Sequence, residues 1–337
     1  MKLEDELKKL TAYPEPTSKV EVVQTHISFI FITDKYVYKV KKPVDFGFLD
    51  FTTLEKRLEY CQKEVALNAR LSPDVYLGVV NITDEGGALV FDGKGQVVEY
   101  AVKMKKIPMD RLMENLLAKG ELTEEMVKEV AGKIAKFHSE AATSKVIDRF
   151  GSIMVIKTNT DENFQQSEPY IGKSISKKQF ESIRKYTDDF YKTKKSIINS
   201  RIAQHKIKDC HGDLHMQHIC LTEPIIIFDC IEFNDRFRYS DTAADIAFLA
   251  MDLDFHGQRG LSKVLMDAYA EYAGDPGVYD MLNFYKIYRA YVRGKVISFQ
   301  LDDPHISEEG KEKALQTAQK YFELAAGYVK EEKEGGA

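Results

Sequence analysis

The sequence predicts an α+β protein of two lobes, a β-rich lobe over residues 1–104 and a mainly helical lobe over residues 105–337. Alternating apolar residues predict strands in much of the first part, whereas apolar residues at helical spacing dominate the second. The length of 337 residues supports two lobes, because a single core rarely grows beyond about 250–300 residues. A short apolar hairpin at residues 219–229 interrupts the helical part, and polar residues flank it.

In the first lobe, residues 20–40 read as strands with a bend at 33–35, and further strands are expected at 76–83, 88–91 and 97–104. A helix is expected from about Thr53, with Leu54, Leu58 and Cys61 on one face. Glu64 lies on or beside that apolar face, and a charged residue that points inward needs a partner. Lys39, on the neighbouring strand, is the expected partner.

In the second lobe, helices are expected over residues 122–142, 176–202, 261–273, 278–301 and 308–330, with another beginning at 240. Residues 150–172 are polar and lack a clear period, so the sequence predicts an irregular surface segment there. The division between the lobes is placed where Pro108 follows a basic pair and breaks the strand pattern.

The polar side chains that suggest a catalytic site are concentrated in residues 210–235. The sequence of this segment is C-H-G-D-L-H-M-Q-H-I-C-L-T-E-P-I-I-I-F-D-C-I-E-F-N-D. Two isoleucine-rich runs joined by a Pro-containing turn predict a β-hairpin. A hairpin brings its two ends together, so Asp213, His218 and Asp229 are expected to converge. A cluster of side chains that are costly to bury indicates a functional site.

Two functions fit this cluster. Asp213 could act as a general base while His218 and Asp229 hold a divalent metal that carries phosphates. Alternatively, His211, Asp213, His215 and His218 could bind a catalytic zinc or iron for hydrolysis, since imidazole and carboxylate are usual ligands of those metals.

The segment H-G-D-L-H followed by I-I-I-F-D-C-I-E-F resembles the catalytic and metal-binding segments of the aminoglycoside phosphotransferase-like kinases. That resemblance implies a two-lobed protein-kinase-like fold, with ATP between the lobes and transfer of its γ-phosphoryl group to the hydroxyl of a small-molecule acceptor. It makes Asp213 the catalytic residue and Asp229 the Mg²⁺ ligand. It also makes Lys39 and Glu64 a clamp for the ATP phosphates.

The same resemblance suggests further positions. The hinge that contacts adenine through its backbone would fall at residues 102–105, mainly Met104. Donors to the phosphates would come from the first hairpin, from Thr25, His26 or Ser28. Asp245 resembles the aspartate that supports the catalytic loop, and Glu232 and Asn234 would add contacts beyond the metal aspartate. Asp241, Asp252 and Asp254 could attract a cationic acceptor or simply lie on solvated helix faces.

His218 departs from the pattern, which usually has Asn there. Imidazole suits softer metals such as Mn²⁺ better than an amide oxygen does. The enzyme could therefore use a softer metal, or keep His218 outside the coordination sphere near Asp213 or a phosphate while Asp229 holds Mg²⁺. It could also be a nucleotide-binding pseudokinase. The second consequence is favoured, because Asp213, Asp229 and Lys39 are all present.

Composition excludes several other classes. A net charge of −5 argues against general nucleic-acid binding, and no apolar run is long enough for a membrane span. The acidic N-terminus lacks the apolar region of a signal peptide, and the four cysteines form no C-x-x-C pair, so a cytoplasmic protein with free thiols is expected.

The sequence motifs of other kinase and nucleotide-binding classes are missing: the glycine-rich loops of P-loop kinases and Rossmann proteins are absent. Asp45-Phe46-Gly47 precedes the catalytic segment, so it is not expected to be a kinase metal motif.

Overall fold

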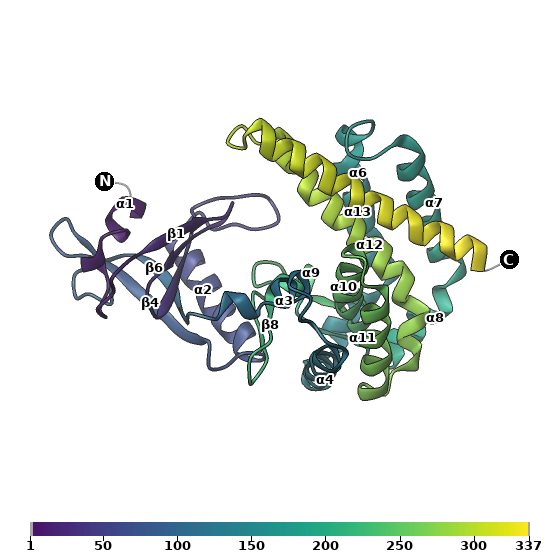
Figure 1. Cartoon of the computed structure of the whole chain (residues 1–337), viewed down its shortest axis with the longest axis horizontal. Helices are drawn as coiled ribbons and strands as arrows, with labels where there is room; N and C mark the ends of the chain where they lie inside the picture. The colour runs from purple at the N-terminus through teal and green to yellow at the C-terminus, as the bar shows by residue number, and fades with distance from the viewer. Residues whose placement is uncertain (1–2, 336–337) are drawn as a thin grey trace. The chain divides into compact units, whose positions relative to one another are not determined.

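The computed structural model of the chain (Figure 1) describes residues 3–335 and divides by packing into two compact units. Unit 1 comprises the residues up to Glu121 together with Gln217–Asp235, and unit 2 comprises Leu122–Met216 and the residues from Arg236 onward. This grouping differs from the predicted lobes, because residues 105–121 and the hairpin pack with the sheet. The functional division into lobes 1–104 and 105–337 stays a prediction.

Unit 1 is built on a six-stranded sheet with the order β1-β2-β3-β6-β4-β5, in which every neighbouring pair is antiparallel. The strands are β1 (Glu21–Gln24), β2 (Ser28–Ile32), β3 (Tyr36–Lys41), β4 (Tyr76–Asp84), β5 (Leu89–Phe91) and β6 (Gln96–Lys105). The predicted bend at residues 33–35 joins β2 to β3, so that hairpin is confirmed. The same stretch also contains β1, which extends the sheet by one strand.

The two faces of the sheet are covered by different elements. Helix α2 (Leu54–Ala69) packs on one face, and the side chain of its N-cap Thr53 accepts a hydrogen bond from the Lys56 N–H. The other face carries an aromatic core that includes Tyr13, Tyr38 and Phe91 and is covered by α1 (Leu3–Leu7) and a 3-10 turn, η1 (Leu10–Ala12). Because side chains alternate along a strand, β3 sends its tyrosines to the aromatic core and its lysines toward α2.

The predicted catalytic hairpin is present and belongs to unit 1. Its strands are β8 (Ile219–Cys220) and β9 (Ile226–Ile227), paired antiparallel. The Ser72 hydroxyl donates to Ile227 O, and Leu221 N donates to Arg111 O. These bonds fix the hairpin to the loop between α2 and β4 and to the chain that follows β6, which continues as η2 (Met109–Arg111) and α3 (Met113–Ala118).

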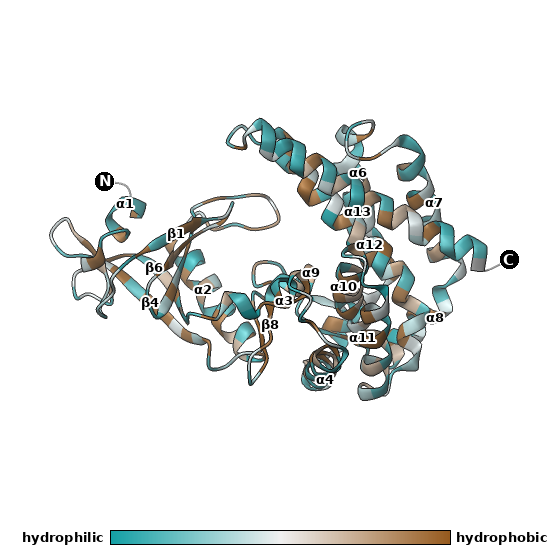
Figure 2. Cartoon of the chain, viewed as in Figure 1, coloured by the Kyte–Doolittle hydropathy of each residue, from teal (hydrophilic) through white to brown (hydrophobic). Residues whose placement is uncertain are grey.

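Unit 2 is mainly helical. Its helices are α4 (Glu124–Glu140), α5 (Lys145–Asp148), α6 (Ile153–Ser167), α7 (Lys177–Thr193), α8 (Lys195–Ala203), α9 (Asp235–Arg238), α10 (Thr242–Phe255), α11 (Arg259–Tyr272), α12 (Tyr279–Ser298) and α13 (Glu308–Gly335). A two-stranded sheet joins β7 (Ile207–Asp209) to β10 (Tyr239–Asp241). Helix α10 is buried on all sides and is mostly brown in Figure 2, as expected for a central helix. Among residues 3–335, no helix combines the length and apolar character needed to cross a membrane.

The prediction of an irregular segment at residues 150–172 was wrong, because most of it forms α6. Helix α6 buries Ile156 and Phe164, but its other buried positions are the polar Thr160, Asn163 and Ser167. Thr160 lies 3.1 Å from the Tyr191 hydroxyl, and Asn163 accepts a bond from Lys295. A helix that buries polar residues shows no hydrophobic period, so the pattern could not reveal it.

Candidate active site

Two lysines of β3 point toward α2 and share one glutamate. Nζ of Lys39 lies 2.9 Å from Oε1 of Glu64, and Nζ of Lys41 donates a 2.6 Å hydrogen bond to Oε2 of the same residue. Burial alone would raise the pKa of Glu64, but the two ammonium groups together hold it below its usual value. The predicted contact between Lys39 and Glu64 is therefore present, and its role in binding nucleotide stays a prediction.

Lys41 was missed as a site residue, since only Lys39 was expected to have a partner on α2. Its side chain is fully buried and also donates to Glu232, the residue that follows the hairpin. Burial would lower the pKa of Lys41, but Glu232 and Glu64 raise it above its ordinary value. One signal could have identified it, because residues two apart on a strand share a face, so Lys41 must follow Lys39 toward α2.

Asp229 joins this network from the end of the hairpin. It accepts a 2.7 Å hydrogen bond from Nζ of Lys39, and its backbone N–H donates to the Tyr76 hydroxyl at 3.1 Å. Its φ of 63° lies in the left-handed region, which costs a non-glycine residue energy and is concentrated at functional sites. The side chain is 42% exposed, so a ligand could reach it.

His218 lies beside Asp229 within unit 1, with its Nε2 3.6 Å from Oδ2 of the aspartate. The Phe228 N–H donates to His218 O at 3.0 Å, which fixes the start of the hairpin against its end. An imidazole nitrogen and a carboxylate oxygen at this separation could bind one divalent cation together. The hairpin therefore brings His218 and Asp229 together, as predicted.

The charges of this network come from helix, strand and hairpin segment together. Lys39 and Lys41 face the carboxylates of Glu64, Asp229 and Glu232. Burial raises the pKa of Glu232 although Lys41 opposes it. A divalent cation at Asp229 would add positive charge beside these carboxylates.

The two other predicted nucleotide contacts lie in the same sheet. Ser28 is paired in register with Lys41, and its buried Oγ has no hydrogen-bond partner among residues 3–335. Met104 lies near the end of β6, between Val37 of β3 and Tyr76 of β4, and its side chain packs in an apolar cluster with Phe228. The roles of Ser28 and Met104 stay predictions.

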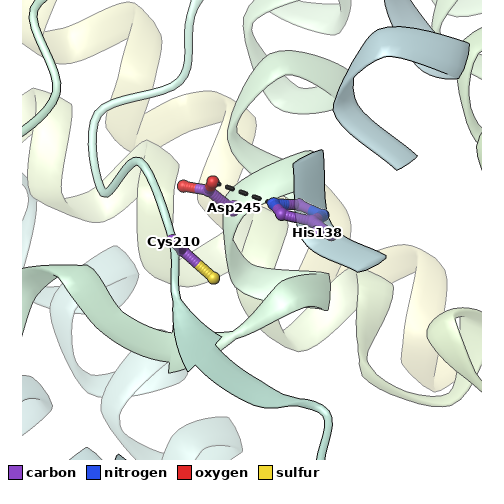
Figure 3. A group of neighbouring side chains, drawn as sticks. All are labelled: His138, Cys210 and Asp245. Carbon is purple, nitrogen blue, oxygen red and sulfur yellow. Dashed lines mark hydrogen bonds and ion pairs between the residues drawn. The ribbon is translucent and has the colours of Figure 1, made fainter. Parts of the chain in front are cut away.

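Asp213, the predicted catalytic residue, lies in unit 2 on a loop held by buried groups. The N–H groups of His211 and Gly212 donate to the two carboxylate oxygens of Asp245 at 2.9 and 2.8 Å. Figure 3 shows this carboxylate facing His138 from α4, with a distance of 3.1 Å between Asp245 Oδ2 and His138 Nε2. Burial would raise the pKa of Asp245, but the hydrogen bond with His138 and the nearby Arg289 hold it well below its usual range. Asp245 thus supports the loop.

Two histidines of the proposed hydrolase site, His211 and His215, are buried and make contacts within the protein. His211 is fully buried, and its Nδ1 accepts a hydrogen bond from the N–H of Asp213. His215 is also buried and lies with its Nε2 3.4 Å from Oδ2 of Asp213, against the Phe248 ring. His211 is thus turned into the protein to shape the loop.

The three aspartates considered for a cationic acceptor are buried. Asp241 is buried and pairs with Arg201 at 2.6 Å, and Asp254 is buried and accepts from Lys286 at 2.8 Å. Asp252 accepts the N–H of Met216 at 2.9 Å. The expectation of solvated helix faces was wrong, because all three are buried with partners that are remote in sequence. The attraction of a cationic acceptor stays a prediction. Of the accessory residues after Asp229, Glu232 binds Lys41, and Asn234 donates to Phe48 O. Asp45-Phe46-Gly47 lies in the loop between β3 and α2.

The two lysines can be separated by mutation. We expect Lys39→Met to weaken nucleotide binding by about tenfold or more, because a charge-assisted bond is worth about 1.5–3 kcal/mol. Stability should change little, since Lys41 still neutralises Glu64. Calorimetric measurement of nucleotide affinity checks this prediction. Lys56→Met, which changes an exposed lysine of α2, is the control. Unchanged affinity in Lys39→Met would remove it from the nucleotide site.

Comparison with known proteins supports the same architecture. No protein-family model matches the chain. A choline/ethanolamine kinase family protein from Mesorhizobium loti superposes with a TM-score of 0.55 at 13% identity, covering 97% of this chain and 98% of that one. The GDP complex of aminoglycoside 2′-phosphotransferase-IIIa superposes with a TM-score of 0.52 at 13% identity, covering 96% and 98%. This chain has the aminoglycoside phosphotransferase-like fold. The predicted α+β, protein-kinase-like architecture is therefore confirmed.

Sequence relatives exist as well. Uncharacterized proteins of Mycobacterium tuberculosis and Mycobacterium bovis are each 30% identical to this chain over 312 residues. The match covers 92% of this chain and 60% of theirs. The chain thus spans about 60% of the length of the curated relatives it matches, and the fold is what the comparisons establish.

Proposed function

We propose that the protein is a kinase that transfers the γ-phosphoryl group of ATP to a hydroxyl of a small molecule. The observation that carries this proposal is the chain of contacts from Glu64 through Lys39 to Asp229, which joins helix, strand and hairpin within one unit. In phosphoryl transfer, catalysis depends on positioning and on charge compensation by a lysine, a metal and a base. The phosphotransferase-like fold supports the same chemistry.

Each predicted residue has a role in this proposal. Lys39, held by Glu64, would bind ATP phosphates, and Ser28 offers a buried hydroxyl on the same face of the sheet. The apolar cluster around Met104 and Phe228 offers a surface for the adenine ring. Asp213 would accept the proton of the acceptor hydroxyl.

A divalent cation fits beside Asp229 and His218, since both ligand atoms lie together at the end of the hairpin. When bound, Mg²⁺ or Mn²⁺ would neutralise charge on the phosphate oxygens. The structural cost of holding Asp229 in the left-handed region also fits a residue kept for such a contact.

The direct test of this function is ligand stabilisation followed by turnover. ATP with Mg²⁺ at one hundred times its Kd is expected to stabilise the protein by about 2.7 kcal/mol, as any ligand that binds only the native state must. Release of ADP in an acceptor screen then establishes transfer. Stabilisation by zinc or iron without any effect of ATP would favour the hydrolase, and ATP binding without ADP release from any acceptor would favour a pseudokinase.

His218 allows a test of the metal. The sequence favoured a position of His218 outside the coordination sphere, but its Nε2 lies 3.6 Å from Asp229 Oδ2, which supports a role as ligand. We therefore expect His218→Asn to raise the ratio of Mg²⁺-supported to Mn²⁺-supported activity severalfold, because the change replaces a softer nitrogen ligand with an amide oxygen. Initial rates with each metal at saturating ATP check the prediction. Equal changes with both metals would mean that the imidazole lies outside the coordination sphere.

A further inference from the structure

One arginine of unit 2 lies beside the proposed catalytic loop. On α12, Arg289 donates from Nη1 to Gly212 O at 2.9 Å and from Nε to Ala244 O at 3.2 Å. These bonds fix α12 against the residue that precedes Asp213. Arg293 is four residues further along α12, so it lies on the same face about 6 Å along the helix axis.

The charged groups around Arg293 agree with this placement beside the loop. Burial would lower the pKa of Arg293, but Tyr321, Asp213 and Asp252 raise it above its ordinary value. The guanidinium lies 5.7 Å from the centre of the Tyr321 ring. Arg293 is only partly buried. Arg293 is therefore a fixed cation in the field of the proposed base.

Arg293 differs from other arginines of the same unit in its partners. Arg201, Arg236 and Arg238 each form an ion pair with a carboxylate. Within the described part of the chain, the guanidinium of Arg293 has no carboxylate within 4.0 Å. Partial burial of a guanidinium without an ion pair is costly, and its planar donors match the geometry of a carboxylate or a phosphate.

The carboxylates of this region cannot provide the opposite kind of site. Asp241 and Asp254 are buried and already neutralised by Arg201 and Lys286, and Asp252 accepts a backbone N–H. A cationic acceptor that approached Asp213 would also meet the positive charge of Arg293. The charged groups that remain available beside the loop therefore favour an anion.

We propose that Arg293 binds an anionic group, a carboxylate or a phosphate, carried by the acceptor, and thereby sets the acceptor hydroxyl beside Asp213. The inference rests on the proposed kinase function and narrows its substrate to hydroxy acids and phosphorylated alcohols. In the reaction, the acceptor oxygen bonds to the γ-phosphorus, the bond from that phosphorus to the β,γ-bridging oxygen breaks, and ADP leaves. The hydroxyl proton passes to Asp213.

The test uses pairs of acceptors that differ in one acidic group: D-glycerate with glycerol, and D-gluconate and glucose 6-phosphate with glucose. Choline serves as the cationic comparison. With ATP and Mg²⁺, an anionic member is expected to have a kcat/KM at least about tenfold above that of its neutral counterpart. Equal or better turnover of the neutral members or of choline overturns the inference, as does the failure of every anionic member to bind or react in a protein that binds ATP.

Variants of Arg293 test whether this residue causes the preference for anionic acceptors. Arg293→Met is expected to raise KM for the anionic acceptor by about tenfold to a hundredfold with a smaller change in kcat. In Arg293→Lys, KM should lie between the values of Arg293→Met and wild type, because an ammonium is a point charge without the planar donors of a guanidinium. Arg259→Met, which removes an exposed arginine of α11 paired with Glu331, is the matched control and should behave as wild type.

Two further measurements show whether Arg293 binds the acceptor or the transferred phosphoryl group, and they separate failure of this inference from failure of the kinase proposal. ATP hydrolysis measured without acceptor should be the same in Arg293→Met and in wild type. A parallel loss of hydrolysis would mean that Arg293 serves the transferred phosphoryl group, which overturns the assignment to the acceptor. If ATP neither binds nor is consumed, the kinase proposal fails, and calorimetric binding of D-glycerate still decides on Arg293. Binding that Arg293→Met leaves unchanged, or no binding at all, overturns the inference.

Discussion

Asp213→Asn is expected to lower kcat by about 10²–10⁴-fold, the usual contribution of a general base, and to leave ATP affinity nearly unchanged. The base acts on the acceptor hydroxyl during transfer, whereas the contacts proposed for the nucleotide come from Lys39, Ser28 and Asp229 in the other unit. Asparagine keeps the shape of the side chain and removes its ability to accept a proton.

The variant should remain folded, because several bonds that do not involve the Asp213 carboxylate hold the loop in place. The N–H groups of His211 and Gly212 are held by Asp245, and Gly212 O is held by Arg289. The Asp213 side chain itself is 35% exposed. Unfolding curves of the variant should therefore overlay those of wild type.

Steady-state rates and ATP titrations check this prediction, with Asp161→Asn on the exposed face of α6 as the control. A fall in ATP affinity as large as the fall in kcat would reassign Asp213 to metal binding. Retention of full kcat would show that transfer needs no base at this position.

The sequence was sufficient where one local pattern determined the outcome. Alternation on β3 and the apolar face of α2 together predicted that Lys39 would meet Glu64. The hairpin pattern likewise predicted that His218 and Asp229 would lie together. In both cases, element geometry fixes the direction of the side chain, so the contact follows from few assumptions.

The sequence was insufficient where a polar residue is buried against a partner that is remote in the chain. Lys41 is buried because Glu232, 191 residues later in the chain, returns to it after the hairpin. Asp254 is buried because Lys286 neutralises it from another helix. Charged residues are usually exposed, so the sequence favours solvent for each of them until the tertiary contact is known. The missed helix α6 has the same cause, since its inward face is largely polar.

Lys41→Met is expected to lower the free energy of unfolding of the protein by about 3–5 kcal/mol, the usual cost of removing one partner from a buried ion pair. The side-chain of Lys41 is fully buried between Glu64 and Glu232, so its loss leaves two carboxylates with less compensation in a region that excludes water. Lys39 still neutralises Glu64, which leaves Glu232 as the residue most affected.

Urea unfolding of Lys41→Met, Lys56→Met and the double variant Lys41→Met/Glu232→Gln checks this prediction. Lys56 pairs with Asp50 on the surface, and such pairs contribute at most about 1 kcal/mol. The double variant should regain part of the lost stability, because Gln removes the charge that Lys41 had balanced. If Lys41→Met costs no more than Lys56→Met, the buried network does not stabilise unit 1.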